Sequence, residues 1–279
     1  MRVIPAQVIS QAVAQLCITA NQQLPPDVEK AILTSQGEET WAKAKESLLL
    51  LKENMDLAKE KELPICQDTG MVSVFVTLGQ GVEIQGDFQE AIQEGVAWGY
   101  QEGFLRSSMV ADPLNRVNTG DNTPASITVD LIEGDIFHLV LMPKGFGSEN
   151  MSRLKMCKPS EGVQGVKDFV LETVQLAGPN ACPPMVVGVG IGGNFDKVTQ
   201  LAKKALLRPL DQRHKEEFYK DLEISLLEEV NGLGIGPQGF GGKTTALGLA
   251  IEKAPTHVAG LPVAVAINCH VTRRASCYL

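Results

Sequence analysis

A short segment, Cys66 to Thr69, carries a thiol, an amide, a carboxylate and a hydroxyl in consecutive positions. Pro64 lies just before it, Gly70 follows it, and residues 72–78 then alternate between apolar and other side chains. Loops that proline and glycine fix at the start of a strand present side chains in set directions, and functional residues concentrate on such loops. Cys66 by itself fits two interpretations, because a thiol is also a common core side chain.

Three of the six cysteines share this setting. Cys66, Cys182 and Cys269 each lie beside an expected strand end and close to a glutamine or asparagine. Three thiolates without a fourth suit a [4Fe–4S] cluster with one open iron, because a fully ligated cluster takes four ligands, and an open iron is a Lewis acid. Loop cysteines also occur by chance, so structural thiols remain the alternative. The other cysteines are Cys17, Cys157 and Cys277.

Two glycine-rich segments resemble nucleotide-binding motifs, but neither meets the full requirements of its motif. Gly188 to Gly193 matches GxGxxG, but the acidic residue that should close a second strand about 20 residues later is replaced by a helix end and charged loop at 207–212. Residues 236–244 resemble a phosphate-binding loop, yet five residues separate Gly236 from Gly242 where four are needed, and Pro237 offers no N–H. The better interpretation of these glycines is that they let the backbone pack closely near a functional site. A local zinc site is not indicated, since the sequence has no CxxC or HxxxH pair.

The composition is that of an ordinary globular protein. The 279 residues are 44% hydrophobic and 21% charged, with a net charge of −8, which argues against nucleic acid as a partner. Spanning a membrane takes roughly 20 consecutive apolar residues, and no such run occurs. The N-terminus lacks the pattern of a signal peptide, and dispersed cysteines are typical of a reducing compartment. We therefore expect a cytoplasmic protein without a membrane partner.

Periodicity predicts helices over residues 5–61, with Ile4, Val8, Ala12 and Leu16 on one face, a second helix opening at Pro25-Pro26, and a capping box of Ser35 and Glu38 before a third. Residues 126–133 and 136–142 flank Gly134-Asp135, which predicts an antiparallel hairpin. Further strands are expected at 72–78, 185–189 and 261–267, and further helices at 88–102, 161–177, 195–207 and 214–231. This mixture predicts an α/β fold of mixed β-sheets surrounded by helices, in one domain over 1–279 with a helical N-terminal region, 1–62.

Seven segments resemble one known family across almost the whole chain, in the right order. They are CQDTG (66–70), NTGDNTP (118–124), GFGSEN (145–150), ACPP (181–184), GFGGKTT (239–245), PTH (255–257) and NCHVTRR (268–274). The chain is similar to the α subunit of the class I fumarase and L-tartrate dehydratase family, which are iron–sulfur hydro-lyases. The resemblance implies a [4Fe–4S] cluster on Cys66, Cys182 and Cys269, and reversible hydration of a small dicarboxylate, first of all fumarate to L-malate.

By position in the family's motifs, Asp68 would handle the proton on the substrate oxygen. The substrate-binding residues would be Gln67, Arg106, Gly147 and His257. A secondary contribution, positive electrostatic potential around the substrate dianion, would come from Lys243, Arg273 and Arg274. Purely structural interpretations stay open for three of these residues: a turn cap for Asp68, a surface arginine for Arg106 and a structural histidine for His257.

The family also occurs as fused chains, and the smaller C-terminal domain is missing from this sequence. The resemblance therefore implies a beta subunit that carries this domain and the base acting at carbon, in a dimer of alpha–beta pairs. An L-tartrate dehydratase subunit is the alternative within the family. From other classes, a non-catalytic iron–sulfur or zinc scaffold that binds a partner is the main rival, and a nucleotide-dependent enzyme is the third.

Overall fold

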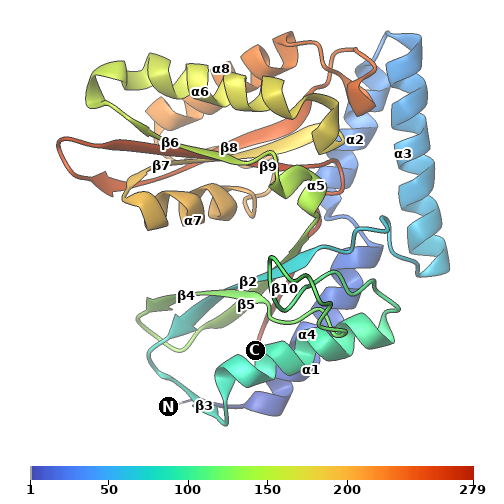
Figure 1. The fold of residues 1–279 in the computed structure, drawn as a ribbon, viewed down its shortest axis with the longest axis vertical. Coiled ribbons are helices and arrows are strands. Elements are labelled where there is room, and N and C mark those ends of the chain that lie inside the picture. The colour runs from blue at the N-terminus through green and yellow to red at the C-terminus, as the bar shows by residue number, and fades with distance from the viewer. Residues whose placement is uncertain (1) are drawn as a thin grey trace. The chain divides into compact units, whose positions relative to one another are not determined.

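The computed structural model describes residues 2–279, and its N-terminal region is helical, as predicted (Figure 1). The elements there are β1 (Arg2–Pro5), α1 (Ala6–Gln22), α2 (Pro26–Glu38) and α3 (Ala42–Lys61). The buried face of α1 is offset from the predicted one, because Ile9 and Val13 are buried while Val8 is 40% exposed. Ser35 does not cap the third helix, since it lies inside α2 and its hydroxyl donates to the carbonyl of Ala31 at 2.8 Å.

The chain divides into two units, each assembled from separate segments and each with its own sheet and core. Unit 1 comprises Met1–Pro25, Met55–Phe146 and Arg273–Leu279, and unit 2 comprises Pro26–Asn54 and Gly147–Thr272. The expectation of a single domain over 1–279 stays a prediction.

The main sheet of unit 1 has the strand order β10-β5-β2-β4. Its strands are β2 (Met71–Gly79), β4 (Ser126–Ile132), β5 (Phe137–Lys144) and β10 (Ala275–Tyr278), while β1 pairs with β3 (Val82–Gln85). Alternate residues of the central strands, such as Val74 and Leu139, point to one face, and α1 and α4 (Phe88–Glu102) pack there (Figure 1). β2 and α4 lie where the periodicity predicts them.

The predicted hairpin of β4 and β5 is wrong. β2 lies between these strands, parallel to β4 and antiparallel to β5. The central position suits β2, whose Val72 and Val74 are buried, whereas β4 at the sheet edge leaves Leu131 65% exposed. Gly134 does form a turn with positive φ, but its carbonyl accepts the N–H of Gly81 at 2.7 Å.

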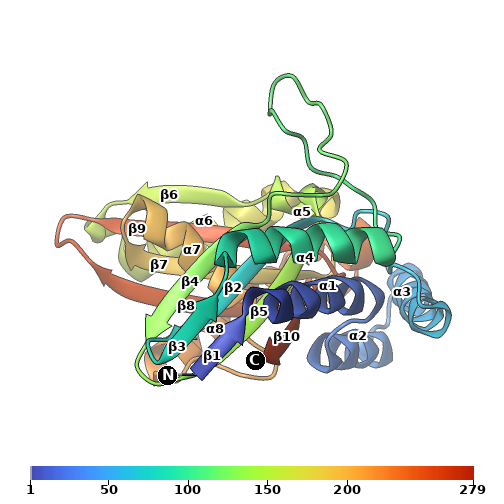
Figure 2. The same ribbon diagram turned by 90° about the horizontal axis from the view of Figure 1, so that it is seen from below.

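Between α4 and β4, residues 107–121 extend as an arm beyond the end of α4 (Figure 2). Backbone bonds close the arm as an irregular hairpin: Ala111 donates to Val117 at 2.8 Å and Thr119 donates to Met109 at 3.0 Å. Arg106 stands at one end of the arm and Asn122 at the other. The turn formers that the sequence marks at 118–124 therefore form its return strand and base.

Unit 2 has the strand order β6-β9-β7-β8, with β7 parallel to β8 and antiparallel to β9. The strands are β6 (Arg153–Cys157), β7 (Met185–Gly193), β8 (Ala246–Thr256) and β9 (Leu261–Asn268). One face carries α6 (Gly162–Ala177) and α8 (Glu217–Gly232), and the other carries α7 (Phe195–Ala205) (Figure 1). Short helical segments are α5 (Phe146–Glu149), η1 (Pro159–Glu161), η2 (Gly178–Ala181) and η3 (Pro237–Gly239). The predicted α/β class with mixed sheets is confirmed.

The GxGxxG glycines lie within β7 rather than in a turn after it. A Cβ on Gly188 would lie 2.2 Å from the carbonyl O of Ala202, and one on Gly190 would lie 2.2 Å from that of Val198. These glycines therefore let α7 pack directly on the strand. The motif serves helix–strand packing instead of forming a dinucleotide-binding turn.

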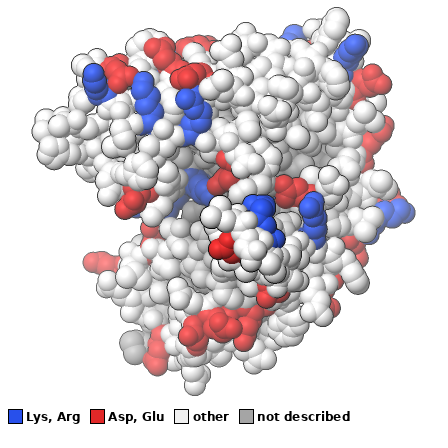
Figure 3. All heavy atoms as spheres, in the orientation of Figure 1, with Lys and Arg blue, Asp and Glu red and all other residues white. Residues whose placement is uncertain are grey.

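None of the helices formed by residues 2–279 is long and apolar enough to cross a membrane. On the face seen in Figure 3, acidic side chains gather over α4. At the N-cap of α4 and within the helix, Asp87, Glu90 and Glu94 are exposed, in keeping with the negative net charge of the chain.

Candidate functional site

The loop that carries Cys66 to Gly70 lies against residues 144–146 of the same unit. A Cβ on Gly70, whose φ is +76°, would lie 2.7 Å from the backbone of Lys144, so this contact requires glycine. Asp68 joins the two segments: its Oδ1 accepts the N–H of Gly70 at 3.0 Å and its Oδ2 accepts the N–H of Phe146 at 2.9 Å. Two polar loops that are far apart in the sequence thus share one carboxylate.

Buried side chains from three other segments hold the carbonyl groups of this loop. These donors are Tyr100, Asn122 and Arg273, each at most 3% exposed. Tyr100 donates to the carbonyl O of residue 69 at 2.6 Å, Asn122 donates to that of residue 70 at 3.1 Å, and Arg273 donates to that of residue 68. Burial raises the pKa of Tyr100, so its hydroxyl stays protonated as a donor. The backbone around Asp68 is therefore preorganised.

Arg273 is a buried cation whose contacts are carbonyl groups. Besides the loop, it donates from Nε to the carbonyl O of Pro143 at 3.2 Å. Within the described part of the chain its Nη1 is buried without a hydrogen-bond partner. A buried donor without a partner is costly in a protein core.

Arg106 is attached to the same loop through its backbone, because Thr69 Oγ1 donates to its carbonyl O at 2.8 Å. Its side chain is exposed, as is that of Gln67, while Cys66 and Asp68 are partly buried. The structure therefore brings four predicted site residues together at one end of unit 1.

Two predicted residues meet in unit 2. Cys182 precedes β7 and Cys269 follows β9. These two strands pair antiparallel, so both cysteines lie at the same end of the two central strands. The backbone N–H of His270 donates to the carbonyl O of Cys182 at 3.2 Å, and the ring Nδ1 of His270 lies 2.9 Å from the same oxygen. Gln238 Nε2 donates to the carbonyl O of Pro183 at 2.7 Å and lies 3.3 Å from the ring of His270.

The other two predicted residues of unit 2 differ in their distance from these cysteines. Gly147 belongs to α5, and a Cβ there would lie 3.8 Å from the carbonyl O of Asn180, close to the Cys182 segment. His257 lies exposed in the turn between β8 and β9, where its Nδ1 accepts the N–H of Ala259 at 3.2 Å. β9 spans 8 residues, so roughly 26 Å of strand separates that turn from Cys269. Unit 2 does not bring His257 to the cysteines.

Among the residues that the structure describes, no group of three His, Cys, Asp or Glu side chains is arranged to hold a metal ion. Cys66 belongs to unit 1, whereas Cys182 and Cys269 belong to unit 2. The meeting of these three thiols at one cluster therefore stays a prediction.

The surroundings of the cysteines nevertheless fit such a cluster. Burial raises the pKa of the three thiols that the sequence does not mark, which opposes formation of the thiolate that iron binds; these are Cys17, Cys157 and Cys277. Cys182 is exposed, and Cys66 and Cys269 are partly buried. Beside Cys269, the buried Nδ2 of Asn268 has no partner within residues 2–279, and it is a donor suited to a cluster sulfide.

The glycine-rich segment 236–245 is anchored by a carboxylate of the chain itself. Glu39 is 3% exposed, and its Oε2 accepts the N–H of Lys243 at 2.8 Å, while Oε1 accepts two N–H groups of the α2–α3 turn at 2.8 and 2.9 Å. Lys243 Nζ donates to the carbonyl O of Glu38, the last residue of α2, at 2.9 Å. These contacts show that the segment packs closely against the chain's own α2–α3 turn, which favours a packing role over nucleotide binding. The positive potential expected from Lys243 stays a prediction.

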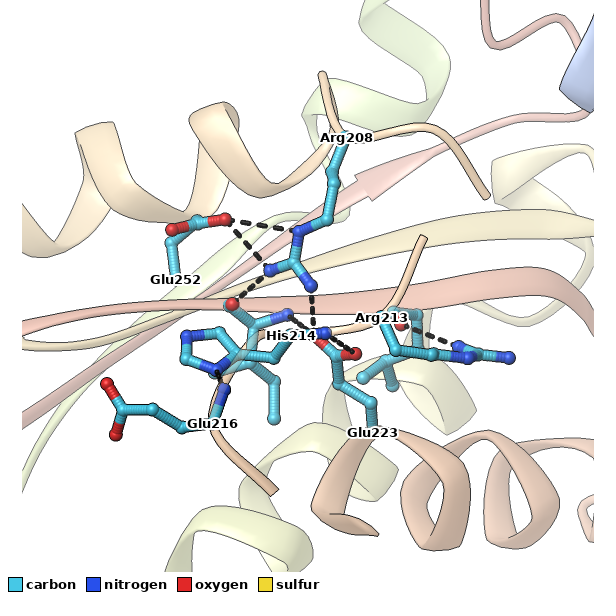
Figure 4. Close-up of polar contacts among 8 residues, drawn as sticks. Arg208, Arg213, His214, Glu216, Glu223 and Glu252 are labelled. Carbon is cyan, nitrogen blue, oxygen red and sulfur yellow. Dashed lines mark hydrogen bonds and ion pairs between the residues drawn. The ribbon is translucent and has the colours of Figure 1, made fainter. Parts of the chain in front are cut away.

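A second buried polar cluster, at the joint of α8 and β8, contains no predicted site residue (Figure 4). Arg208 lies between two carboxylates, with Nη1 2.6 Å from Glu223 Oε1 and Nη2 2.8 Å from Glu252 Oε1. Glu223 is fully buried and also accepts the N–H groups of Ile251 and His214 at 2.8 and 2.9 Å. Each charge has an opposite charge in contact, so this cluster joins helix to sheet.

Comparison with known proteins gives matches over nearly the whole chain. The model of the family described as fumarate hydratase (Fumerase) matches residues 10–278. The putative L(+)-tartrate dehydratase subunit alpha of Methanocaldococcus jannaschii is 44% identical over 275 residues, which cover 96% of each chain. The L(+)-tartrate dehydratase subunit alpha of Escherichia coli strain K12 is 34% identical over 272 residues, 96% of this chain and 89% of that protein.

Proposed function

The chain belongs to the fumarate hydratase family as a hydro-lyase alpha subunit, and on that premise we propose that it removes water from a small hydroxydicarboxylate, with L-tartrate as the first candidate. The names of the relatives support tartrate. The description of the family supports fumarate, which the sequence motifs put first and which now stands second. The observation that carries the proposal is the carboxylate of Asp68, held on a rigid loop that also fixes the backbone of Arg106.

The reaction breaks one C–O bond and one C–H bond on neighbouring carbons. L-Tartrate loses a hydroxyl group and a proton as water, and the enol that remains becomes oxaloacetate by a proton shift. Asp68 in its carboxylic acid form delivers a proton to the departing oxygen, and in the reverse direction its carboxylate takes that proton back. The N–H groups of Gly70 and Phe146 hold the side chain in one orientation. A carboxylate fixed in this way loses little freedom when substrate binds.

Binding of the dicarboxylate falls to the residues around this loop. Arg106 is suited to a substrate carboxylate because its planar guanidinium donates two parallel N–H bonds. Gln67 contributes an amide, and Gly147 leaves room for backbone approach. Cys66, Cys182 and Cys269 are the residues that would hold a [4Fe–4S] cluster, which supplies a Lewis-acidic iron when bound.

The base that acts at carbon is assigned to a beta subunit, since the relatives are named as alpha subunits. His257 fits this scheme only through a second alpha chain, because it lies at the far end of β9 from Cys269 in its own chain. A dimer of alpha–beta pairs offers that arrangement. Mixing Asp68→Asn chains with His257→Asn chains should then restore part of the activity that each variant lacks alone.

The test is an anaerobic assay of the reconstituted alpha–beta complex with L-tartrate, L-malate and fumarate, with oxaloacetate, fumarate and L-malate measured as products. A higher kcat/KM for L-tartrate supports the first candidate, and a higher value for the malate–fumarate pair supports the second. Iron per chain is measured beside it. Cys66→Ser, Cys182→Ser and Cys269→Ser should each lose the iron, whereas Cys17→Ser and Cys157→Ser should retain it, and full iron in any of the first three contradicts the assignment.

A further inference from the structure

We propose that Asn122 is a positioning residue that sets Arg106 in register with Asp68. The proposal rests on the hydro-lyase function above, in which Asp68 handles a proton and Arg106 binds a carboxylate. Asn122 belongs to the NTGDNTP motif, to which neither the family resemblance nor the proposed mechanism gives a role.

The side chain of Asn122 bonds to both parts of the candidate site. Its Nδ2 donates to the carbonyl O of Gly70 at 3.1 Å, two residues after Asp68. Its Oδ1 accepts the N–H of Ser108 at 2.7 Å, two residues after Arg106. One amide thus spans the loop that carries the proposed acid and the segment that carries the proposed substrate clamp.

The setting of Asn122 fixes this amide in place. The residue is fully buried, where an amide is costly unless both its ends are paired, and here both are. Its φ of +63° is a conformation that asparagine tolerates better than most residues, and its backbone N–H donates to Ser107 Oγ at 3.0 Å. A shift of the amide would therefore disturb Gly70 and Ser108 together.

Asn118 in the same motif is a natural control. It is exposed, its Nδ2 donates to the carbonyl O of Ser107 at 3.1 Å, and its Oδ1 accepts the N–H of Gly120 at 2.7 Å. Both asparagines stabilise the base of the arm. Of the two, Asn122 is the one that also bonds to the loop of Asp68.

The test uses the cluster-loaded alpha–beta complex with the substrate that it turns over best. Asn122→Asp keeps the size of the side chain and an acceptor for Ser108, but it sets a carboxylate oxygen against the carbonyl of Gly70. We expect KM to rise about 10-fold while kcat stays within about 3-fold, the effect of one misplaced substrate contact. Asn118→Asp should leave KM within about 2-fold.

A double-mutant cycle with Arg106→Lys separates positioning from general damage. If Asn122 acts through Arg106, the two changes together should raise KM by clearly less than the product of their separate effects. Purely multiplicative effects overturn the proposal, because they mean that Asn122 matters only to the fold. If Asn122→Asp loses iron, Ser107→Ala takes its place in the cycle; it removes one acceptor of Asn122 and should raise KM about 3-fold.

Hydrogen exchange gives a readout that does not depend on turnover. In the same complex, Asn122→Gly should speed exchange of the Ser108 N–H at least about 10-fold and leave exchange in β7 unchanged. Unchanged exchange at Ser108 overturns the proposal. If the unmodified complex turns over neither L-tartrate nor the malate–fumarate pair, the proposed function fails; if it turns over one of them and the cycle is multiplicative, the positioning role alone fails.

Discussion

Two polar clusters of this protein, one at the joint of α8 and β8 and one around Asp68, treat charge in opposite ways. At the joint of α8 and β8, Arg208 contacts Glu223 and Glu252, so each buried charge meets an opposite one (Figure 4). Around the candidate site, the guanidinium of Arg273 bonds to the backbone of the loop that carries Asp68, and no ion pair between Arg273 and the Asp68 carboxylate forms. Arg273 bonds to carbonyl groups, and the carboxylate of Asp68 bonds to backbone N–H groups.

This difference separates a cluster built for stability from one built for chemistry. Opposite charges that satisfy each other leave little for a ligand, and their loss is felt mainly by the fold. Charges that are held by neutral backbone groups keep their electrostatic influence on whatever enters the site. The comparison predicts that changes at the first cluster alter unfolding, and that changes at the second alter turnover.

The largest expected effect is at Asp68. Asp68→Asn should lower kcat of the alpha–beta complex by about 10² to 10⁴, the usual contribution of a general acid or base, with iron content intact. Asp112→Asn is the matched control, because Asp112 also accepts two backbone N–H groups, from Leu114 and Asn115, at 2.9 and 2.6 Å. If the two variants behave alike, Asp68 is a turn cap and the acid lies elsewhere.

The next effect is on stability, at Glu223. Glu223→Gln leaves Arg208 with one carboxylate partner and should lower the free energy of unfolding by roughly 3 kcal/mol, as for other broken buried pairs. Denaturant unfolding of the variant beside the unmodified protein measures this. KM and kcat of the folded complex should not change, and a large loss of kcat would erase the distinction between the clusters.

The sequence predicted those parts of the fold that depend on local pattern. Alternation located β2, and the apolar stripe located α4. β8 (Ala246–Thr256) was not predicted, because it has no alternation and owes its pairing to β7 beside it. The prediction of a β4–β5 hairpin was wrong for the same reason. The insertion of β2 between these strands depends on tertiary packing, and the turn residues carry no signal for it.

The same distinction holds for the residues of the candidate site: local motifs were predictable, and contacts between distant segments were not. The polar segment 66–69 was visible as a motif, and the structure adds Arg106 to it through one bond from Thr69. Tyr100 gave no signal, because its part consists of bonds to carbonyl groups about 30 residues away in the chain. Arg273 was visible only as one positive charge among several, since its burial and its contacts with the loop arise from folding.

Arginine-to-lysine changes sharpen the comparison at smaller scale. Arg273→Lys removes the planar fork that reaches both Pro143 and Asp68, so the loop should shift and kcat/KM should fall about 10-fold. Arg208→Lys, the same change at the other cluster, should lower the unfolding midpoint in denaturant and leave kcat/KM within about 2-fold. Equal kinetic losses in both variants would contradict the comparison.

The smallest effect concerns pH and Glu39, whose carboxylate is closed off by donors of its own chain. Burial raises the pKa of Glu39, but the N–H groups of Trp41, Lys243 and Thr40 outweigh burial and leave it below the ordinary value of 4.5. A lowered pKa in the folded state means that the unfolded chain binds the proton more readily. The stability that Glu39 contributes is therefore complete above about pH 5 and is lost as the pH falls through the folded-state pKa. Melting temperatures of the unmodified protein and Glu39→Gln should differ at pH 7 and converge as the pH falls through the folded-state pKa of Glu39. A difference that stays constant with pH would show that the Glu39 side chain contributes packing and not charge. The kcat at pH 7 should be the same in both proteins, because N–H groups of the chain itself bond to the Glu39 carboxylate.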